Sequence, residues 1–225
     1  MSKHKEEEKN IDLGQVYSKS EQFVENNKKS IMVAVGILIA VIGGWFAYGT
    51  YISGEEKIAQ ENIWKSQYYF ETDSLDKALM GDGQYFGFEY IAENYKGTNS
   101  AKLANYYIGI IYKQKGDLEF AIDYLKKASI KDPILGAVAL GSIGDCYTDL
   151  GDYDEAIKYF NKAVDHSNNS FTAPIYLNKA ALTYEFVGNW TKAAKLYQEI
   201  INEYSSSPEA ALVKKNLARV EQMAN

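Results

Sequence analysis

The apolar and polar positions of the chain set apart one long uncharged stretch near its beginning. Residues 31–52, IMVAVGILIAVIGGWFAYGTYI, contain no charged side chain. As a helix rising about 1.5 Å per residue, the stretch is roughly 33 Å long, enough to cross a hydrocarbon layer about 30 Å thick. We therefore predict a single transmembrane anchor over residues 31–52. A buried helix of a soluble core is one alternative. A cleaved signal peptide is the other, although the stretch is longer than usual for a signal and thirty residues precede it.

The charges beside this stretch predict its orientation. Lys28 and Lys29 lie just before it, whereas Glu55 and Glu56 follow it closely. Lysine next to a membrane helix usually stays in the cytoplasm. We therefore expect residues 1–30 to form a cytoplasmic leader and everything after the anchor to lie outside the cytoplasm.

Small residues recur along one face of the expected anchor. Gly36, Ala40 and Gly44 are spaced by four positions. Such a stripe lets another membrane helix approach closely, and close packing is the main attraction available between helices in lipid. The sequence predicts a helix-packing face here, with an incidental spacing of common small residues as the alternative.

The segments on either side of the anchor show weaker helical patterns. A capping box at Ser18 and Glu21 predicts a short helix that runs into the anchor. Ser53 and Gly54 predict a break after the anchor. The expected elements are a helix over 18–29, a helix over 55–71, a loop over 72–84 and a helix over 85–95. We interpret residues 53–101 as a degenerate leading helical repeat.

From residue 102 the sequence repeats itself. The segments KGDLEFAIDYLKKA, LGDYDEAIKYFNKA and VGNWTKAAKLYQEI begin at residues 115, 150 and 187. Their matching positions are glycines Gly116, Gly151 and Gly188, alanines Ala121, Ala156 and Ala193, and large residues Leu125, Phe160 and Tyr197. Upstream, the small residues Gly109, Gly144 and Ala181 also match, each followed three positions later by Tyr112, Tyr147 or Tyr184. The pattern predicts three pairs of antiparallel helices.

Each matching position has a physical reason. A small residue in the first helix lets the second helix approach closely, and the central glycine ends the first helix. We expect the tyrosine to fill the space between the helices and the alanine of the second helix to face the small position. These motifs resemble the tetratricopeptide repeat family over residues 102–207. Residues 208–225 are then expected to form a helix that caps the last repeat. The expected fold class is all-α, a helical solenoid behind one membrane helix.

The resemblance also implies a concave groove lined by the first helix of each repeat. Transferring the family's groove positions gives Leu103, Tyr106, Tyr107, Ile110, Lys113, Val138, Ser142, Asp145, Thr148, Ile175, Asn178, Lys179, Leu182 and Phe186. This mixed lining suits an extended or unfolded peptide better than a small molecule. It lacks the full set of Lys, Asn and Arg with which some family members hold a C-terminal carboxylate.

Composition and charge exclude several function classes. The 225 residues carry a formal charge of −6, and the region after the anchor has Arg219 as its only arginine. This argues against a nucleic-acid partner. Cys146 is the single cysteine and is expected to be a packed helix residue. His4 and His166 lie in no catalytic or metal-binding pattern, and the sequence shows no activated nucleophile, phosphate loop or metal cluster, so we expect no enzyme activity and no cofactor or metal.

A second resemblance covers nearly the whole chain. The leader FVENNKK, the anchor ending GGWFAYGTY and the modest repeat domain together look like the YfgM family. That resemblance implies an ancillary subunit of the SecYEG translocon in the bacterial inner membrane, with a periplasmic repeat domain. Its implied partners are the translocon, a PpiD-type anchored chaperone and unfolded exported chains. The alternatives are a scaffold for a division or outer-membrane assembly, and a receptor on an organelle membrane with its repeats facing the cytoplasm.

Overall fold

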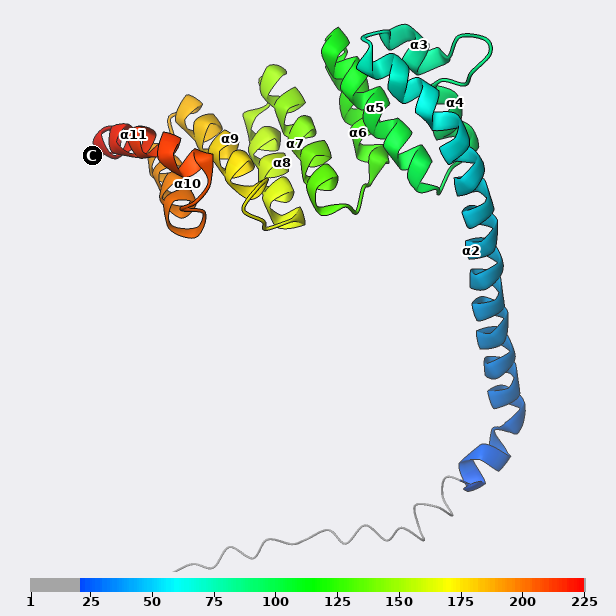
Figure 1. Cartoon of the computed structure of the whole chain (residues 1–225). Helices are drawn as coiled ribbons and strands as arrows, with labels where there is room; N and C mark the ends of the chain where they lie inside the picture. The colour runs from blue at the N-terminus through cyan, green and yellow to red at the C-terminus, as the bar shows by residue number, and fades with distance from the viewer. Residues whose placement is uncertain (1–20, 225) are drawn as a thin grey trace, which may run out of the picture. The chain divides into compact units, whose positions relative to one another are not determined.

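The computed structural model describes residues 21–224, and that range is helical apart from turns and an isolated bridge between Gly81 and Phe86. The chain divides into two compact units, Met1–Tyr51 and Ile52–Asn225. The helices are α2 Lys28–Glu71, α3 Leu75–Met80, α4 Phe88–Asn94, α5 Asn99–Lys115, α6 Leu118–Ala128, α7 Pro133–Asp149, α8 Tyr153–His166, α9 Ala173–Phe186, α10 Trp190–Glu203 and α11 Pro208–Met223 (Figure 1). The expected capping box begins at Ser18, outside the described residues; residues 21–26 are helical and Asn27 forms a turn.

Helix α2 has 44 residues and is long and apolar enough to be a candidate membrane span. Within α2, no residue of its most apolar 18-residue segment is buried against the rest of the described chain. The predicted break at Ser53 and Gly54 is wrong, because α2 continues through both residues to Glu71. A single glycine in a helix costs only about 1 kcal/mol relative to alanine, and the following Glu55, Glu56 and Lys57 are good helix formers.

The leading part of the second unit differs from its expected loop and helix. The predicted loop over 72–84 contains the short helix α3, whose Ala78 and Leu79 are buried in one core cluster with Phe88 and Ile91 of α4. Helix α4 begins three residues later than predicted, at Phe88. The cause is local: the bridge from Gly81 to Phe86 keeps the chain extended up to that point.

Glu56 of α2 ties this helix to the start of α5. Its Oε2 atom accepts hydrogen bonds from the backbone N–H of Asn99 at 2.6 Å and of Ser100 at 3.1 Å, and its Oε1 accepts one from the Ser100 hydroxyl at 2.9 Å. These are N–H groups of the first turn of α5, which have no partner within that helix. Burial raises the pKa of Glu56, but the hydrogen bonds from Ser100, Gln60 and Asn99 outweigh it, so the pKa falls below its usual value.

Helices α5 to α10 form three consecutive hairpins, which Figure 1 shows side by side from green to orange. The three central glycines, Gly116, Gly151 and Gly188, all have positive φ, as expected for residues that end a helix. The small residues of the first helices do admit the second helices closely. A Cβ atom added at Gly144 would lie 2.6 Å from the Phe160 ring, and one at Gly109 would lie 2.6 Å from the Leu125 side chain.

This contact corrects one detail of the predicted packing. The side chain that faces the small position is the large residue of the second helix, Leu125 or Phe160. The alanine one turn earlier comes near only at Gly109, where the Ala121 carbonyl oxygen would lie 3.1 Å from an added Cβ. Ala156 is fully buried in the same core cluster as Phe160 and Tyr176. The alanine therefore keeps the second helix close, while the large residue fills the gap that the glycine leaves.

Each hairpin is followed by a helix that has a proline in its first turn, Pro133 in α7, Pro174 in α9 and Pro208 in α11. Between α8 and α9, the Asn169 carboxamide oxygen accepts from the backbone N–H of Phe171 and Thr172, and its Nδ2 donates to the Thr172 hydroxyl. Asn168 accepts a hydrogen bond from the Tyr204 hydroxyl, which joins this turn to the next one. Helix α11 then buries Ala210, Val213 and Val220 against the last hairpin, where the sequence places a capping helix.

Candidate functional site

A bridge of charged side chains crosses the first helices of all three hairpins. Asp145 of α7 accepts a hydrogen bond from the Lys113 ammonium of α5 at 2.9 Å and from the Lys179 ammonium of α9 at 2.6 Å. The three side chains keep between 25% and 37% of their surface exposed. The sequence places all three in the groove, and the structure brings them together as one Lys113–Asp145–Lys179 bridge.

Two adjoining cavities lie beside this bridge. The first is about 390 Å³, and its lining residues are Lys113, Asp145, Thr148, Asp149, Phe160, Lys179, Leu182 and Thr183. The second is about 210 Å³, and its lining residues are Thr148, Tyr153, Leu182, Thr183 and Phe186. Because Thr148, Leu182 and Thr183 line both, the two cavities form one surface, which we call the α7–α9 groove.

The far end of the α7–α9 groove is apolar and exposed. Leu182 is 44% exposed and Phe186 is 72% exposed, although both are large apolar residues. They lie four positions apart on α9 and thus share one face. The Phe186 ring leans on Tyr153 of α8, with 4.7 Å between ring centroids. Exposed apolar side chains that adjoin a cavity are typical of a binding surface rather than of a packed core.

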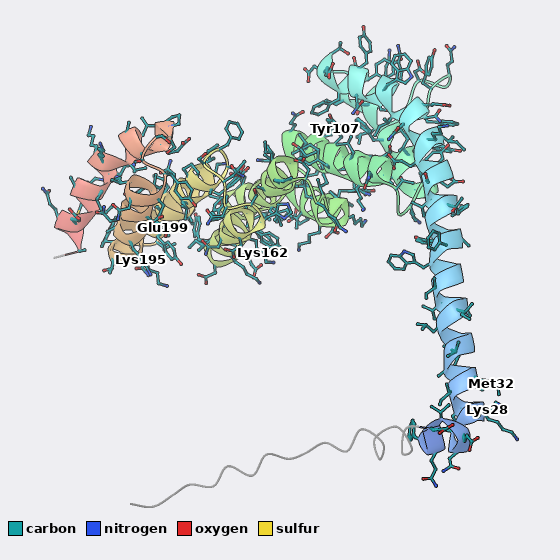
Figure 2. All side chains as sticks on the ribbon, turned by 60° about the horizontal axis from the view of Figure 1, so that its bottom comes forward. Lys28, Met32, Tyr107, Lys162, Lys195 and Glu199 are labelled. Atoms are coloured by element: carbon teal, nitrogen blue, oxygen red, sulfur yellow. The ribbon has the colours of Figure 1, made fainter. Side chains whose placement is uncertain are left out.

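The groove residues expected on α5 are more enclosed. Tyr107, labelled in Figure 2, stacks on Phe88 with 4.8 Å between centroids and meets Phe70 edge-on at 5.0 Å. Leu103 packs against the same cluster, and Tyr106 and Ile110 pack against the neighbouring one. The structure therefore gives Leu103 and Tyr107 partners in the leading helices, and both remain only half-buried.

The other expected groove residues divide between contact and packing roles. Ser142 is buried, and Ile175 packs on the cluster that contains Phe160. Asn178 is half-buried, and among residues 21–224 its Oδ1 is the one buried side-chain oxygen or nitrogen without a hydrogen bond. Tyr176 of α9, which the sequence did not assign to the groove, lies against Gly141, and its burial raises its pKa to about 12.

The expected tyrosine positions lie at interfaces. Tyr112, Tyr147 and Tyr184 are half-buried, and each packs against a core cluster. Tyr147 stacks on Tyr159 of the second helix with 5.5 Å between centroids. The single cysteine, Cys146, is fully buried as predicted, and this burial raises its pKa to about 11.

Sequence reasoning missed Asp149, Tyr153 and Thr183. Asp149 ends α7 and Tyr153 begins α8, so both lie outside the groove positions inferred from the repeat pattern. The signal that could have found Asp149 and Tyr153 is the presence of an acidic residue and an aromatic residue on either side of a helix-ending glycine, Gly151. Within the described residues no group of three or more His, Cys, Asp or Glu side chains could hold a metal ion.

The small-residue face of the expected anchor is open in the structure. Added Cβ atoms at Gly36 and Gly44 would meet nothing within 4 Å. Ala40, between them, is likewise exposed. The role of this small-residue face in packing against another membrane helix remains a prediction.

Comparison with known proteins agrees with this geometry. Two tetratricopeptide repeat models match the chain, over residues 104–129 and 135–202. These hairpins are tetratricopeptide repeats. The chain is also 31% identical over 118 residues to the TPR repeat-containing protein MJ1428 of Methanocaldococcus jannaschii, covering 52% of this chain and 20% of that protein. The chain thus spans about a fifth of the length of that relative.

Solved structures share the tetratricopeptide solenoid. A putative kinesin light chain of Podosopora anserina with TPR-like repeats superposes with a TM-score of 0.52 at 12% identity, over 77% of this chain and 87% of the other. MamA superposes with a TM-score of 0.52 at 16% identity, over 76% and 91%. At these identities the likeness concerns the fold alone. Tetratricopeptide repeats typically bind other proteins and are typically non-catalytic.

Proposed function

We propose that this chain is a membrane-anchored interaction module of the bacterial inner membrane, with its tetratricopeptide repeats in the periplasm. It acts as an ancillary subunit of the Sec translocon and holds newly exported polypeptides for transfer to a PpiD-type anchored chaperone. The α7–α9 groove is its polypeptide-binding surface.

One observation carries the binding role. The α7–α9 groove combines two cavities with Leu182 and Phe186, which are large, apolar and exposed. Burying such side chains against a partner removes apolar surface from water, at about 25 cal/mol for each Å². Removal of this surface from water therefore favours association with the apolar side chains of an unfolded chain.

The anchor and the topology rest on α2 and its flanks. The apolar part of α2 can cross a membrane by length and composition. Lys28 and Lys29 at its start favour a cytoplasmic N-terminus. The translocon role rests on the resemblance of the leader, anchor and repeat domain to the YfgM family.

The experiment is affinity purification of the full chain from bacterial membranes in mild detergent, followed by mass spectrometry. We expect SecY, SecE and SecG with the parent chain, and loss of exported substrate chains with the double variant Leu182→Ala and Phe186→Ala. Leu212→Ala is a matched control, because Leu212 of α11 is 67% exposed and lies outside the groove. Recovery of division or outer-membrane assembly proteins in place of translocon subunits would replace the proposal by a scaffold role.

A further inference from the structure

We propose that the α7–α9 groove selects polypeptide segments in which large apolar residues are next to lysine or arginine, and that it discriminates against acidic segments. This inference rests on the proposed function and adds the chemistry of the partner. It follows from how the charges of the groove are already paired and from which charges are left over.

The first step concerns the two lysines. Lys113 and Lys179 could attract an acidic partner, but both ammonium groups already contact Asp145, at 2.9 and 2.6 Å. An incoming carboxylate at this point would have to lie beside the Asp145 carboxylate. Like charges in contact are unfavourable, and their repulsion is strongest where solvent is partly excluded. Asp145 thus occupies the position that a partner's carboxylate would need.

The second step concerns the charge that is left over. Asp149 lies one helical turn after Asp145 on α7 and lines the same cavity. Among the ion pairs of residues 21–224, none includes Asp149, and its side chain is exposed. Lys113, Lys179, Asp145 and Asp149 together carry two positive and two negative charges, and the Asp149 carboxylate is the one of these four groups that lies outside an ion pair.

The third step concerns the helix ends. Asp149 is the last residue of α7 and Phe186 is the last residue of α9, so the groove runs along two helix C-termini. Helix C-termini carry a partial negative charge that favours nearby cations. Neither α7 nor α9 has a basic residue in its last turn, whereas α5 has Lys113 and Lys115 there. The negative potential at the two ends is therefore not offset from within their own helices.

The fourth step joins charge to shape. Asp149 and Leu182 line one cavity, and Leu182 and Phe186 line the next. A bound segment can therefore place a basic side chain at Asp149 while a neighbouring large apolar side chain covers Leu182 and Phe186. The Asp149 carboxylate makes the groove prefer a basic side chain, and the apolar surface provides most of the affinity.

The test uses the full chain in nonionic detergent and three short fluorescent peptides, measured by fluorescence anisotropy. One peptide alternates Phe and Leu with Lys and Arg, the second has Glu at each basic position, and the third has Ser there. We expect the basic peptide to bind at least about tenfold more tightly than the acidic one, with the Ser peptide between them. Added salt should reduce this difference, because partly exposed charges are screened.

Variants locate the effect on the groove. Phe186→Ala should weaken the basic peptide by about tenfold, as for a strong aromatic contact, whereas Leu212→Ala should not. Asp149→Asn should weaken it by about threefold, as for one partly exposed ion pair. Its matched control is Asp123→Asn, at an exposed position of α6. Asp145→Asn releases Lys113 and Lys179 and should increase affinity for the acidic peptide by about threefold or more.

The outcomes separate this inference from the proposed function. If acidic and basic peptides bind equally and Phe186→Ala weakens both, the groove binds polypeptide but the charge selection is wrong. If Asp145→Asn leaves the acidic peptide unchanged, Asp145 does not exclude carboxylates and the inference is overturned. If no peptide responds to Phe186→Ala, both the selection and the groove's role in the proposed function are wrong, whatever proteins purify with the chain.

Discussion

The contact between Gly144 and Phe160 leads to a prediction about stability. The effect of Gly144→Ala on the free energy of unfolding should change sign when the Phe160 ring is removed. A Cβ atom at Gly144 would lie 2.6 Å from two atoms of the Phe160 ring. Phe160 is 2% exposed and stacks against Tyr176 of the next hairpin, with 6.4 Å between ring centroids. The ring therefore has little room to move away from an added methyl group.

Two effects of Gly144→Ala oppose each other. Alanine in a helix interior is more favourable than glycine by about 1 kcal/mol. Overpacking a close-packed core costs about 1–3 kcal/mol. The net effect in the parent chain is thus a loss of about 0–2 kcal/mol. Phe160→Ala alone should cost about 3–5 kcal/mol, and it also removes the overpacking. In that background Gly144→Ala should therefore stabilise the fold by about 1 kcal/mol.

The measurement is urea unfolding of the full chain in nonionic detergent, followed by far-ultraviolet circular dichroism. The four combinations of the two substitutions form a double-mutant cycle. Gly54→Ala is the control, because an added Cβ at this helical glycine would meet nothing within 4 Å. Its effect should be the same in both backgrounds. An equal effect of Gly144→Ala with and without the Phe160 ring would refute the packing described here.

Four further outcomes are expected. A C-terminal alkaline phosphatase fusion should be active in bacterial cells, whereas a stably expressed but inactive fusion would contradict a periplasmic repeat domain. Replacing Gly36, Ala40 and Gly44 together by Leu should preserve insertion and release a partner membrane helix; unchanged co-purification would show that the stripe is incidental. Ala156→Leu should overpack its hairpin, cost about 1–3 kcal/mol of stability and lower the melting temperature; a melting temperature equal to the parent's would argue against tight packing at Ala156. Cys146 should react slowly with thiol reagents at pH 8, because burial raises its pKa from 9.0 to about 11. Stability should then fall as the pH rises between these values, where only the unfolded thiol ionises, and a fast-reacting native thiol would be inconsistent with its burial.

The repeats could be predicted because their information is local and recurs. Gly116, Gly151 and Gly188 end helices in the left-handed conformation that glycine adopts without strain. Close packing at Gly109 and Gly144 could also be predicted, since only a small residue permits it. The partner across that contact could not, because the alanine and the large residue of the second helix lie one turn apart, and the helix rotation decides which one faces the glycine.

The candidate site was predicted as a set of positions but not as an arrangement. The repeat pattern places Asp145 and Lys179 on the groove side of their helices, yet their ion pair depends on the offset between hairpins, which the sequence does not state. Tyr107 was expected in the groove, and it stacks on Phe88 because the leading helices cover that part of α5. Residues 53–101 carry a weak repeat pattern, so this cover could not be foreseen.

The Lys113–Asp145–Lys179 bridge also bears on how long a chain the groove can hold. The bridge links α5, α7 and α9 through their side chains, and two steps of about one helix diameter, 10–12 Å each, make the crossing roughly 20 Å. An extended chain advances about 3.3 Å per residue, and only about six residues fit along that distance. A long exported chain held here would leave most of its length free. A second protein could then bind the same chain before this one releases it, so the transfer would not require a step in which neither protein binds the chain.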